Sequence, residues 1–387
     1  MTFDPEAPLP HAPEPWAGST MPSRRDGPPY WMTEMIAAEP AVAERIVRRV
    51  QGQSAASTLA AELREAAAGG APIITTGCGT SEHAAMAVAS LLSDALAAGE
   101  QRVAAVQAFE LARSAPRRGM VLAISHEGGT DATNSALRAS AAAGATTGLV
   151  TVSAASPGAA LAEHVITTGE QDQSWCHTVG YVSPLVAGAV LAGIIRADPL
   201  DAVGLRALLD AADDASAADA MAAALHGCDR LLLAGSGIDA VAARELALKI
   251  EEGARMPAVA HQLETVRHGH LAAATPRTGL VLVLTDGEGR GDALLERARA
   301  VLRSARELGM PAAALIAADL GDDVPADLTP SGRAAVPLGG RVPRLAGAAL
   351  ATAIPLQLLA ERLARARGVN PDTIGRDDPR QAAAAEA

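Results

Sequence analysis

The chain has 387 residues, more than one hydrophobic core usually organises, so we expect two domains. Its formal net charge of −12 excludes a protein that binds nucleic acid through a basic face, because a phosphate backbone needs clustered Lys and Arg side chains. Its three cysteines, an odd number without a CxxC spacing, argue against a disulfide framework and favour a reducing, cytoplasmic environment.

The N-terminal segment, residues 1–54, is predicted to be an arm followed by helices. Eight prolines between positions 5 and 29 are incompatible with regular secondary structure over residues 1–30, so this arm is expected to wrap a surface. The next stretch has a helical pattern, and Pro40 is predicted to divide it into two helices. The N-terminal segment lacks the charged start and following apolar run of a signal peptide, so we do not expect one.

From about residue 72, apolar runs of strand length alternate with helical stretches. The strand-like runs are 72–77, 102–107, 120–125, 146–152 and 164–169. Helical stretches follow or separate them at 80–96, 108–113, 130–143, 156–163 and 183–197. This alternation is typical of a parallel, doubly wound sheet with helices on both faces. We therefore predict a first α/β domain over residues 55–205.

The alternation then starts again and predicts a second α/β domain over residues 215–355. Its strand-like runs are 230–237, 279–289, 312–317 and 334–338, and its helical stretches are 238–255, 291–308 and 344–367. The apolar stretch 345–366 is broken by Pro355 and followed by charge, so it is predicted to be a buried helix and not a membrane span. Residues 356–387 are expected to form the end of this helix and a C-terminal tail.

The two halves align as an internal repeat. Gly77 and Gly79 match Gly235 and Gly237 at an offset of 158 residues, and the motif around Ser125 matches the later one at an offset of 160. Similar offsets at two separate motifs favour duplication of one domain.

Two loops of the first half carry polar side chains where predicted strands end. In "TTGCGTSEH" (75–83), a strand leads through Gly-x-Gly into a helix, and Cys78, Gly79, Thr80 and Ser81 are candidates for an oxyanion cradle. An ordinary N-cap at a tight turn is the alternative. Glu82 stands where a dinucleotide fingerprint has its third glycine, so NAD binding is disfavoured.

The second loop, "AISHEGGTDAT" (123–133), adds four candidates for substrate binding: Ser125, His126, Glu127 and Thr130. The carboxyl ends of neighbouring parallel strands form one crevice, so the two loops are expected to converge on one ligand. Adjacent Ser, His and Glu residues cannot form a catalytic triad, because they cannot line up as nucleophile, base and orienting group.

The only lysine of the chain, Lys249, lies in "RELALKIEEGARM", three residues before Glu252. On a helix the two side chains share a face, either as a surface ion pair or as a functional pair. Further along are His261, His268 and His270, but no helical HxxxH or carboxylate spacing supports a metal site. We expect neither a metal nor a cofactor.

Five stretches in order resemble the tandem sugar-isomerase (SIS) domain family, in particular the isomerase half of glucosamine-6-phosphate synthases. They are 32–40, 77–85, 124–133, 247–272 and 368–380. The resemblance implies two tandem SIS domains with flavodoxin-like sheets and a homodimer with a shared active site. It assigns sugar-phosphate binding to Thr80, Ser81, Ser125 and Thr130.

The same resemblance implies roles for three residues in the second half. Glu252 matches the carboxylate that moves a proton between C1 and C2 of the sugar, and Lys249 matches the lysine one turn before it. His268 matches the histidine that helps to open the sugar ring and reaches over from the partner subunit. A compact ammonium is not interchangeable with a planar guanidinium, which accounts for one lysine in a chain that otherwise uses arginine.

Several positions depart from the family pattern. The C-terminal lysine of the family falls at about Ala384, and no glutaminase domain precedes the isomerase half, so amino transfer from glutamine is disfavoured. Glu127 would repel a phosphate, so either it turns away or the ligand is not a simple phosphomonoester. In "QDQSWCHTVGY" (171–181), Trp175 and His177 are candidates to face the sugar, with packing between domains as the alternative for Trp175.

The sequence therefore predicts a cytoplasmic sugar isomerase that acts at C1 and C2 of a sugar phosphate or another carbohydrate derivative, and not a nucleic-acid or membrane protein. Two alternatives stay open. One is a deglycase or amino-sugar deaminase of the same superfamily, and the other is a carbohydrate-binding regulator without catalysis.

Overall fold

The computed structural model describes residues 3–12, 25–97 and 102–386. The chain forms two compact units. Unit 1 consists of residues 3–12, 38–172 and 179–206 of this described part, and unit 2 of residues 25–37, 173–178 and 207–386. The short stretch 173–178 therefore leaves unit 1 and belongs to unit 2.

Unit 1 is built on a five-stranded, fully parallel sheet. Its strands are β1 (Ile73–Gly77), β2 (Val103–Gln107), β3 (Met120–Ile124), β4 (Thr146–Thr151) and β5 (His164–Thr167), in the order β2-β1-β3-β4-β5. Its helices are α2 (Ser54–Ala68), α3 (Thr80–Leu96), α4 (Ala108–Arg113), α5 (Asp131–Ala143), the 3-10 turn η1 (Ala159–Leu161) and α6 (Val179–Arg196).

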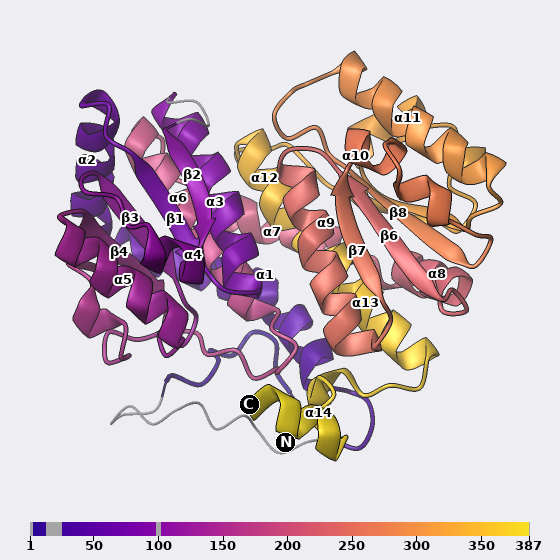
Figure 1. Cartoon of the computed structure of the whole chain (residues 1–387), viewed down its shortest axis with the longest axis horizontal. Helices are drawn as coiled ribbons and strands as arrows, with labels where there is room; N and C mark the ends of the chain where they lie inside the picture. Colours follow the sequence, from indigo (N-terminus) through magenta and orange to yellow (C-terminus); the bar gives the residue numbers. More distant parts are fainter. Residues whose placement is uncertain (1–2, 13–24, 98–101, 387) are drawn as a thin grey trace. The chain divides into compact units, whose positions relative to one another are not determined.

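Both faces of this sheet are covered by helices, as Figure 1 shows. Parallel crossovers are right-handed, so a connection toward β2 and a connection toward β5 lie on opposite faces. Accordingly α3 packs with α6 on one side, while α4 packs with α5 on the other. The core between them is aliphatic, with Val121, Leu122 and Ile124 of β3 fully buried.

Unit 2 repeats this plan. Its strands are β6 (Arg230–Gly235), β7 (Ala258–Gln262), β8 (Thr278–Leu284), β9 (Ala312–Ala317) and β10 (Arg333–Val336), all parallel in the order β7-β6-β8-β9-β10. Its main helices are α8 (Ala215–Leu225), α9 (Ile238–Lys249), α10 (Leu263–Arg267), α11 (Asp292–Glu307), α12 (Arg344–Ala351) and α13 (Ala353–Ala366).

The remaining elements are short or lie at the borders of the units. They are α1 (Trp31–Gln51), α7 (Ala202–Ala212), α14 (Pro379–Glu386), the π-helical turn η2 (Ile250–Ala254), and the 3-10 turns η3 (His270–Ala273), η4 (Ala318–Asp323), η5 (Ala326–Leu328) and η6 (Pro371–Thr373). The predicted α/β class with two doubly wound parallel sheets is confirmed.

The internal repeat holds at the level of single residues. Gly79 and Gly237, each just before a helix, have the same backbone conformation, with φ and ψ of 57° and −128° in one and 59° and −127° in the other. A Cβ atom at Gly77 would lie 2.5 Å from the Ser81 carbonyl oxygen, and one at Gly235 would lie 2.3 Å from that of Asp239. Both turns therefore require glycine for close approach of helix and strand.

Local predictions failed at two prolines. Pro40 does not divide the N-terminal helix, since α1 runs unbroken from Trp31 to Gln51. A proline inside a helix costs about 3 kcal/mol, but burial of one large apolar side chain returns roughly 1.5–3 kcal/mol. Met35, Ile36 and Val42 are all buried on this helix. The predicted helix 344–367 is in turn divided into α12 and α13 at Thr352, with Pro355 in the first turn of α13.

Two segments bear on the expectations about surfaces and membranes. Residues 3–12 contain no helix or strand and lie on unit 1, where the Leu9 N–H donates to the Glu170 carboxylate at 2.9 Å. The rest of the expected arm up to residue 24 lies mostly outside the described residues.

Within the described part, α6 is the helix long and apolar enough to cross a membrane, and 89% of it is buried inside the fold.

Candidate active site

The single lysine lies at the last residue of α9, where the helix widens into the π-helical turn η2. One extra residue per turn shifts the side chains that follow, and such turns are frequent at functional sites. Arg255, with φ of +49°, ends the turn. The turn places Lys249 and Glu252 together, with 2.6 Å between Lys249 Nζ and Glu252 Oε2.

Lys249 is completely buried between two carboxylates. Its Nζ atom also lies 3.6 Å from Oε1 of Glu245, whose side chain is likewise fully buried. Burial alone would lower the pKa of the ammonium, but the charges of Glu252 and Glu245 outweigh it and raise the pKa above its ordinary value. Lys249 is therefore a cation at neutral pH, and the cluster of one ammonium and two carboxylates is electrically unbalanced by one negative charge.

Glu252 is the member of this cluster that reaches solvent, with 27% of its side chain exposed. An incoming molecule can meet the Glu252 carboxylate, whereas the ammonium behind it is out of reach. The geometry therefore gives Lys249 the task of orienting the Glu252 side chain. A role in direct contact with substrate, which the sequence suggested for Lys249, needs a rearrangement of this cluster.

Sequence reasoning did not identify two neighbours of the pair. Glu245 stands four residues before Lys249, so helical spacing was sufficient to find it. Cys176 comes from the stretch 173–178, with its sulfur 3.7 Å from Oε2 of Glu252. A separation of 76 residues in the chain leaves no sequence signal for this contact.

The candidate cradle of unit 1 forms where three strands end. Cys78 follows β1, and its sulfur contacts the Gln107 amide nitrogen at the end of β2 (3.7 Å) and the Thr133 hydroxyl of α5 (3.8 Å). The loops after β1 and β3 therefore meet, as predicted from parallel strands. Burial raises the pKa of the Cys78 thiol, which disfavours the reactive thiolate form.

The polar residues of these loops differ in exposure. Thr80 and Ser125 are buried, Ser81 is half-buried, and Gly79 and Thr130 are exposed. Thr130 precedes α5 as its N-cap residue, without a side-chain cap hydrogen bond. All of them belong to unit 1 at the carboxyl edge of its sheet, which is where doubly wound proteins bind ligands.

His126 and Glu127 both engage the segment that follows β5. His126 is buried, and its Nε2 accepts the Asp172 N–H at 3.0 Å, so this ring atom is used inside the protein. The Glu127 carboxylate accepts a hydrogen bond from the Gln171 amide at 3.3 Å. Asp172 in turn accepts the Gly180 N–H at 2.8 Å. These contacts anchor both side chains toward the body of unit 1.

The equivalent turn in unit 2 is occupied by the chain itself. Glu288 Oε1 accepts the Ile238 N–H at the start of α9 over 2.6 Å, and it lies beside Gly237. The Arg290 guanidinium bonds the Ser236 hydroxyl at 2.9 Å. A carboxylate thus satisfies the helix N-terminus in unit 2, where the helix dipole favours negative charge. Unit 1 is the better candidate for an anionic ligand.

The remaining candidates lie in unit 2. The guanidinium of Arg376 covers the ring of Trp175 at 3.6 Å, so one face of this ring is engaged by a cation–π contact. His177 is half-buried in the same stretch. His268 is 72% exposed and pairs with Glu264 over 2.7 Å.

Two of the three histidines considered for a metal lie together. The rings of His261 and His270 stack with centroids 3.6 Å apart, and loss of water around His261 together with the neighbouring His270 lowers its pKa. In the described part of the chain no three His, Cys, Asp or Glu side chains gather in a way that could hold a metal ion.

A comparison with known protein families finds a match for part of unit 2. Residues 224–316, which include β6, α9 and the Lys249–Glu252 pair, match the family model of the SIS domain. This segment of the chain therefore has the sequence pattern of a SIS domain. The two parallel sheets of the chain fit two SIS domains in tandem, so the resemblance seen in the sequence is confirmed.

Solved structures similar to this chain include three enzymes. The C-terminal domain of glucosamine-fructose-6-phosphate aminotransferase from Francisella tularensis is 19% identical, with a TM-score of 0.74 over 90% of this chain and 99% of that chain. Tagatose-6-phosphate ketose/aldose isomerase from Escherichia coli is 16% identical (TM-score 0.70, 92% and 98% covered).

The third is glucosamine-6-phosphate deaminase from Thermotoga maritima, which is 18% identical (TM-score 0.65, 89% and 97% covered). At these identities the likeness shows the fold. No curated protein sequence matches the chain.

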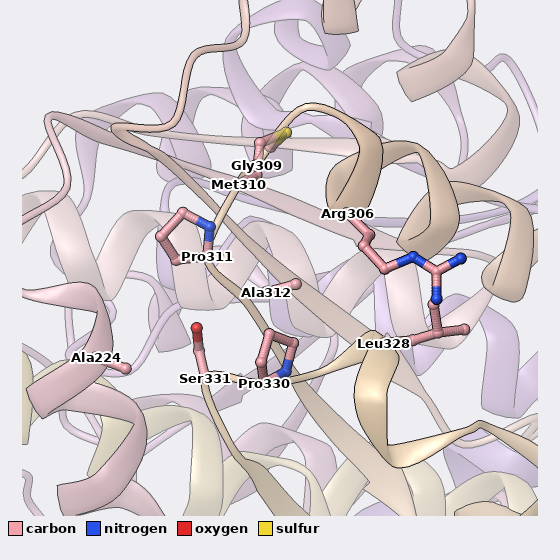
Figure 2. Close-up of a pocket in the computed structure, with 9 residues that line it drawn as sticks. All are labelled: Ala224, Arg306, Gly309, Met310, Pro311, Ala312, Leu328, Pro330 and Ser331. Atoms are coloured by element: carbon pink, nitrogen blue, oxygen red, sulfur yellow. The ribbon is translucent and has the colours of Figure 1, made fainter.

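A cavity of about 400 Å³ in unit 2 is a poor candidate for a substrate site. Met310, Pro311 and Ser331 line it where the chain enters β9 and β10, as Figure 2 shows, with Arg306 of α11 beside Leu328. It therefore lies at the amino ends of the strands. Ligands of doubly wound sheets bind at the carboxyl ends of the strands, where unit 1 places Thr80, Ser81 and Ser125.

Proposed function

We propose that this chain is an enzyme that transfers a proton between C1 and C2 of a sugar phosphate or another carbohydrate derivative, interconverting aldose and ketose. The observation that carries the proposal is the Glu252 carboxylate, part-exposed and held at 2.6 Å by the buried ammonium of Lys249 within a SIS domain. Proton transfer between adjacent carbons needs one carboxylate of fixed orientation, and this pair supplies it.

The chemistry follows from the open-chain sugar. The C1 carbonyl acidifies the C2–H bond, and Glu252 takes this proton while the electron pair forms the C1–C2 double bond of an enediolate. The O2 proton moves to O1, and Glu252 returns its proton to C1, which leaves a carbonyl at C2. Lys249 orients the Glu252 side chain for both proton transfers, and the charges of the neighbouring carboxylates keep its own ammonium positive despite burial.

For the substrate's anionic or hydroxyl groups we propose the polar loops of unit 1: Thr80, Ser81, Ser125 and Thr130. Their hydroxyls follow β1 and β3 at the carboxyl edge of the sheet. Replacement of Ser81 by Ala is expected to raise KM for phosphorylated sugars more than for free ones. Equal KM values for the two classes would show that phosphate does not bind there.

The function is tested by incubating the protein in D2O with free and phosphorylated hexoses, amino sugars and Amadori-type compounds. NMR follows deuterium entry at C1 and C2, and a coupled assay follows ammonia. E252Q is expected to lower kcat by about 10²–10⁴-fold. E251Q is the matched control, because Glu251 is an exposed neighbour whose carboxylate accepts the Ala258 N–H at 3.3 Å.

The same experiment separates the alternatives. Release of ammonia or an amine without a ketose product would replace isomerisation by the deglycase or deaminase reaction. Tight sugar binding without either product would leave a carbohydrate-binding regulator. Loss of activity in E251Q as large as in E252Q would remove the special role of Glu252.

We further propose that the protein works as a homodimer in which His268 serves the partner's site. Its ring is 72% exposed, so it is accessible to a second chain. Mixing E252Q subunits with H268A subunits should restore activity, because half of the mixed sites then combine two intact residues. Mixed dimers that stay as inactive as the parents would show that the sites are not shared.

A further inference from the structure

Cys176 is a buried thiol next to the proposed catalytic carboxylate. None of its surface is exposed, and its sulfur lies 3.7 Å from Oε2 of Glu252 and 4.0 Å from the carbonyl oxygen of Lys249. The single S–H proton of a thiol can serve one acceptor at a time. The carboxylate is both nearer and charged, and it is therefore the stronger acceptor.

The thiol stays protonated at neutral pH. Burial is the main cause that raises its pKa well above the ordinary value, and the charges of Glu252 and Glu245 raise it further, against the opposing effect of Lys249. These three are the charged groups that face the sulfur among the described residues. A protonated thiol is a donor, and the hydrogen bond therefore runs from sulfur to the carboxylate.

Cys176 is fixed in this position from several sides. The Ser174 hydroxyl donates to the Cys176 carbonyl at 3.1 Å and so holds its backbone. Gly253 lies next to the sulfur: a Cβ atom added at Gly253 would be 3.6 Å from Cys176 Sγ and 4.0 Å from Met32 Sδ. The thiol is therefore packed in contact with the π-helical turn that carries Glu252.

Two donors thus converge on one oxygen of Glu252. Lys249 Nζ approaches Oε2 at 2.6 Å and Cys176 Sγ approaches the same atom at 3.7 Å. No hydrogen bond to Oε1 from any described residue accompanies them, and the side chain is 27% exposed. The carboxylate is anchored through one oxygen and offers the other.

We propose that Cys176 is a positioning residue: its thiol donates to Oε2 of Glu252, so that Oε1 is the oxygen that carries the sugar proton. The inference rests on the proposed function and specifies which atom of Glu252 acts. Cys176 does not touch substrate and no bond to sulfur is made or broken. Its contribution is to fix the carboxylate plane and to stabilise the charged form.

Kinetics of two substitutions test the positioning role. C176A should lower kcat about 3–10-fold at unchanged KM, since a thiol is a weaker donor to a charged group than a hydroxyl or amide. The acid limb of the kcat/KM profile should move to higher pH, because a carboxylate that loses a donor is protonated more easily. C176S keeps a donor of similar size and should return both quantities toward those of the wild type.

A spectroscopic measurement tests the hydrogen bond without any need for activity. The S–H stretching band of Cys176 is isolated as the difference between wild type and C176S. E252A should shift this band to higher frequency, because the acceptor that remains, the Lys249 carbonyl oxygen at 4.0 Å, is uncharged and more distant, while E251A should leave the band in place.

The outcomes separate this inference from the proposed function. A wild-type protein without turnover refutes the function, while the S–H band still decides whether the thiol holds the carboxylate. A band that does not respond to E252A overturns the inference. So does a C176A variant with the kcat, KM and pH profile of the wild type.

Discussion

Replacing Lys249 by Met tests how strongly the buried ammonium holds unit 2 together. The substitution keeps the volume and removes the charge, which leaves two carboxylates, Glu245 and Glu252, facing each other without a cation. At an effective dielectric of about 20, charges 2.6 and 3.6 Å apart attract by roughly 6 and 5 kcal/mol. Desolvation and relaxation reduce this, and removal of one partner from a buried pair costs about 3–5 kcal/mol.

We therefore expect K249M to lower the free energy of unfolding by about 3–5 kcal/mol at pH 7. Urea titration followed by tryptophan fluorescence measures it, since Trp31 and Trp175 both lie in unit 2. R48M removes one partner of an exposed pair with Glu44 and is the control, with an expected loss below about 1 kcal/mol.

The pH dependence gives a second signature of K249M. The pKa of Lys249 is raised in the folded state, so its stabilising contribution is complete below the unfolded value of about 10.4 and is lost as pH rises above it. Wild type should lose stability in that alkaline range more steeply than K249M. The reasoning is refuted if K249M unfolds at the same urea concentration as R48M and shows the same alkaline slope as wild type.

Three further predictions concern single contacts. Burial raises the pKa of Asp239 to about 6, so the folded state binds an extra proton between pH 4 and 6. The free energy of unfolding should therefore fall by about 3 kcal/mol as pH rises through this range. D239N should remove this pH dependence in a series of thermal melts. G77A places a methyl group 2.5 Å from the Ser81 carbonyl oxygen and should destabilise by about 1–3 kcal/mol, whereas G227A, with nothing within 4 Å, should not lower the melting temperature. The Asp372 carboxylate accepts hydrogen bonds from the first two N–H groups of α1, at 2.7 and 3.0 Å. In urea titration, D372A should lower the free energy of unfolding by about 0.5–2 kcal/mol, and D372N should lower it less. Equal effects of the two variants would contradict the capping role.

The expected domain boundaries, the homodimer and the cytoplasmic location stay predictions. The fold class, by contrast, was open to sequence reasoning, because strands and helices of a doubly wound sheet alternate in the chain and each carries its own local pattern. The repeat was visible for the same reason: Gly77 and Gly235 are needed by local geometry, and a short motif records that need.

The pairing of Lys249 with Glu252 could also be read from the sequence, since a spacing of three residues on a helix fixes it within one turn. What only the tertiary structure decided is where that pair points. Burial of Lys249, contact of Cys176 with Glu252, and capping of α9 by Glu288 all depend on segments that are distant in the chain. Pro40 shows the same limit, because a local preference of about 3 kcal/mol yields to burial of the side chains around it.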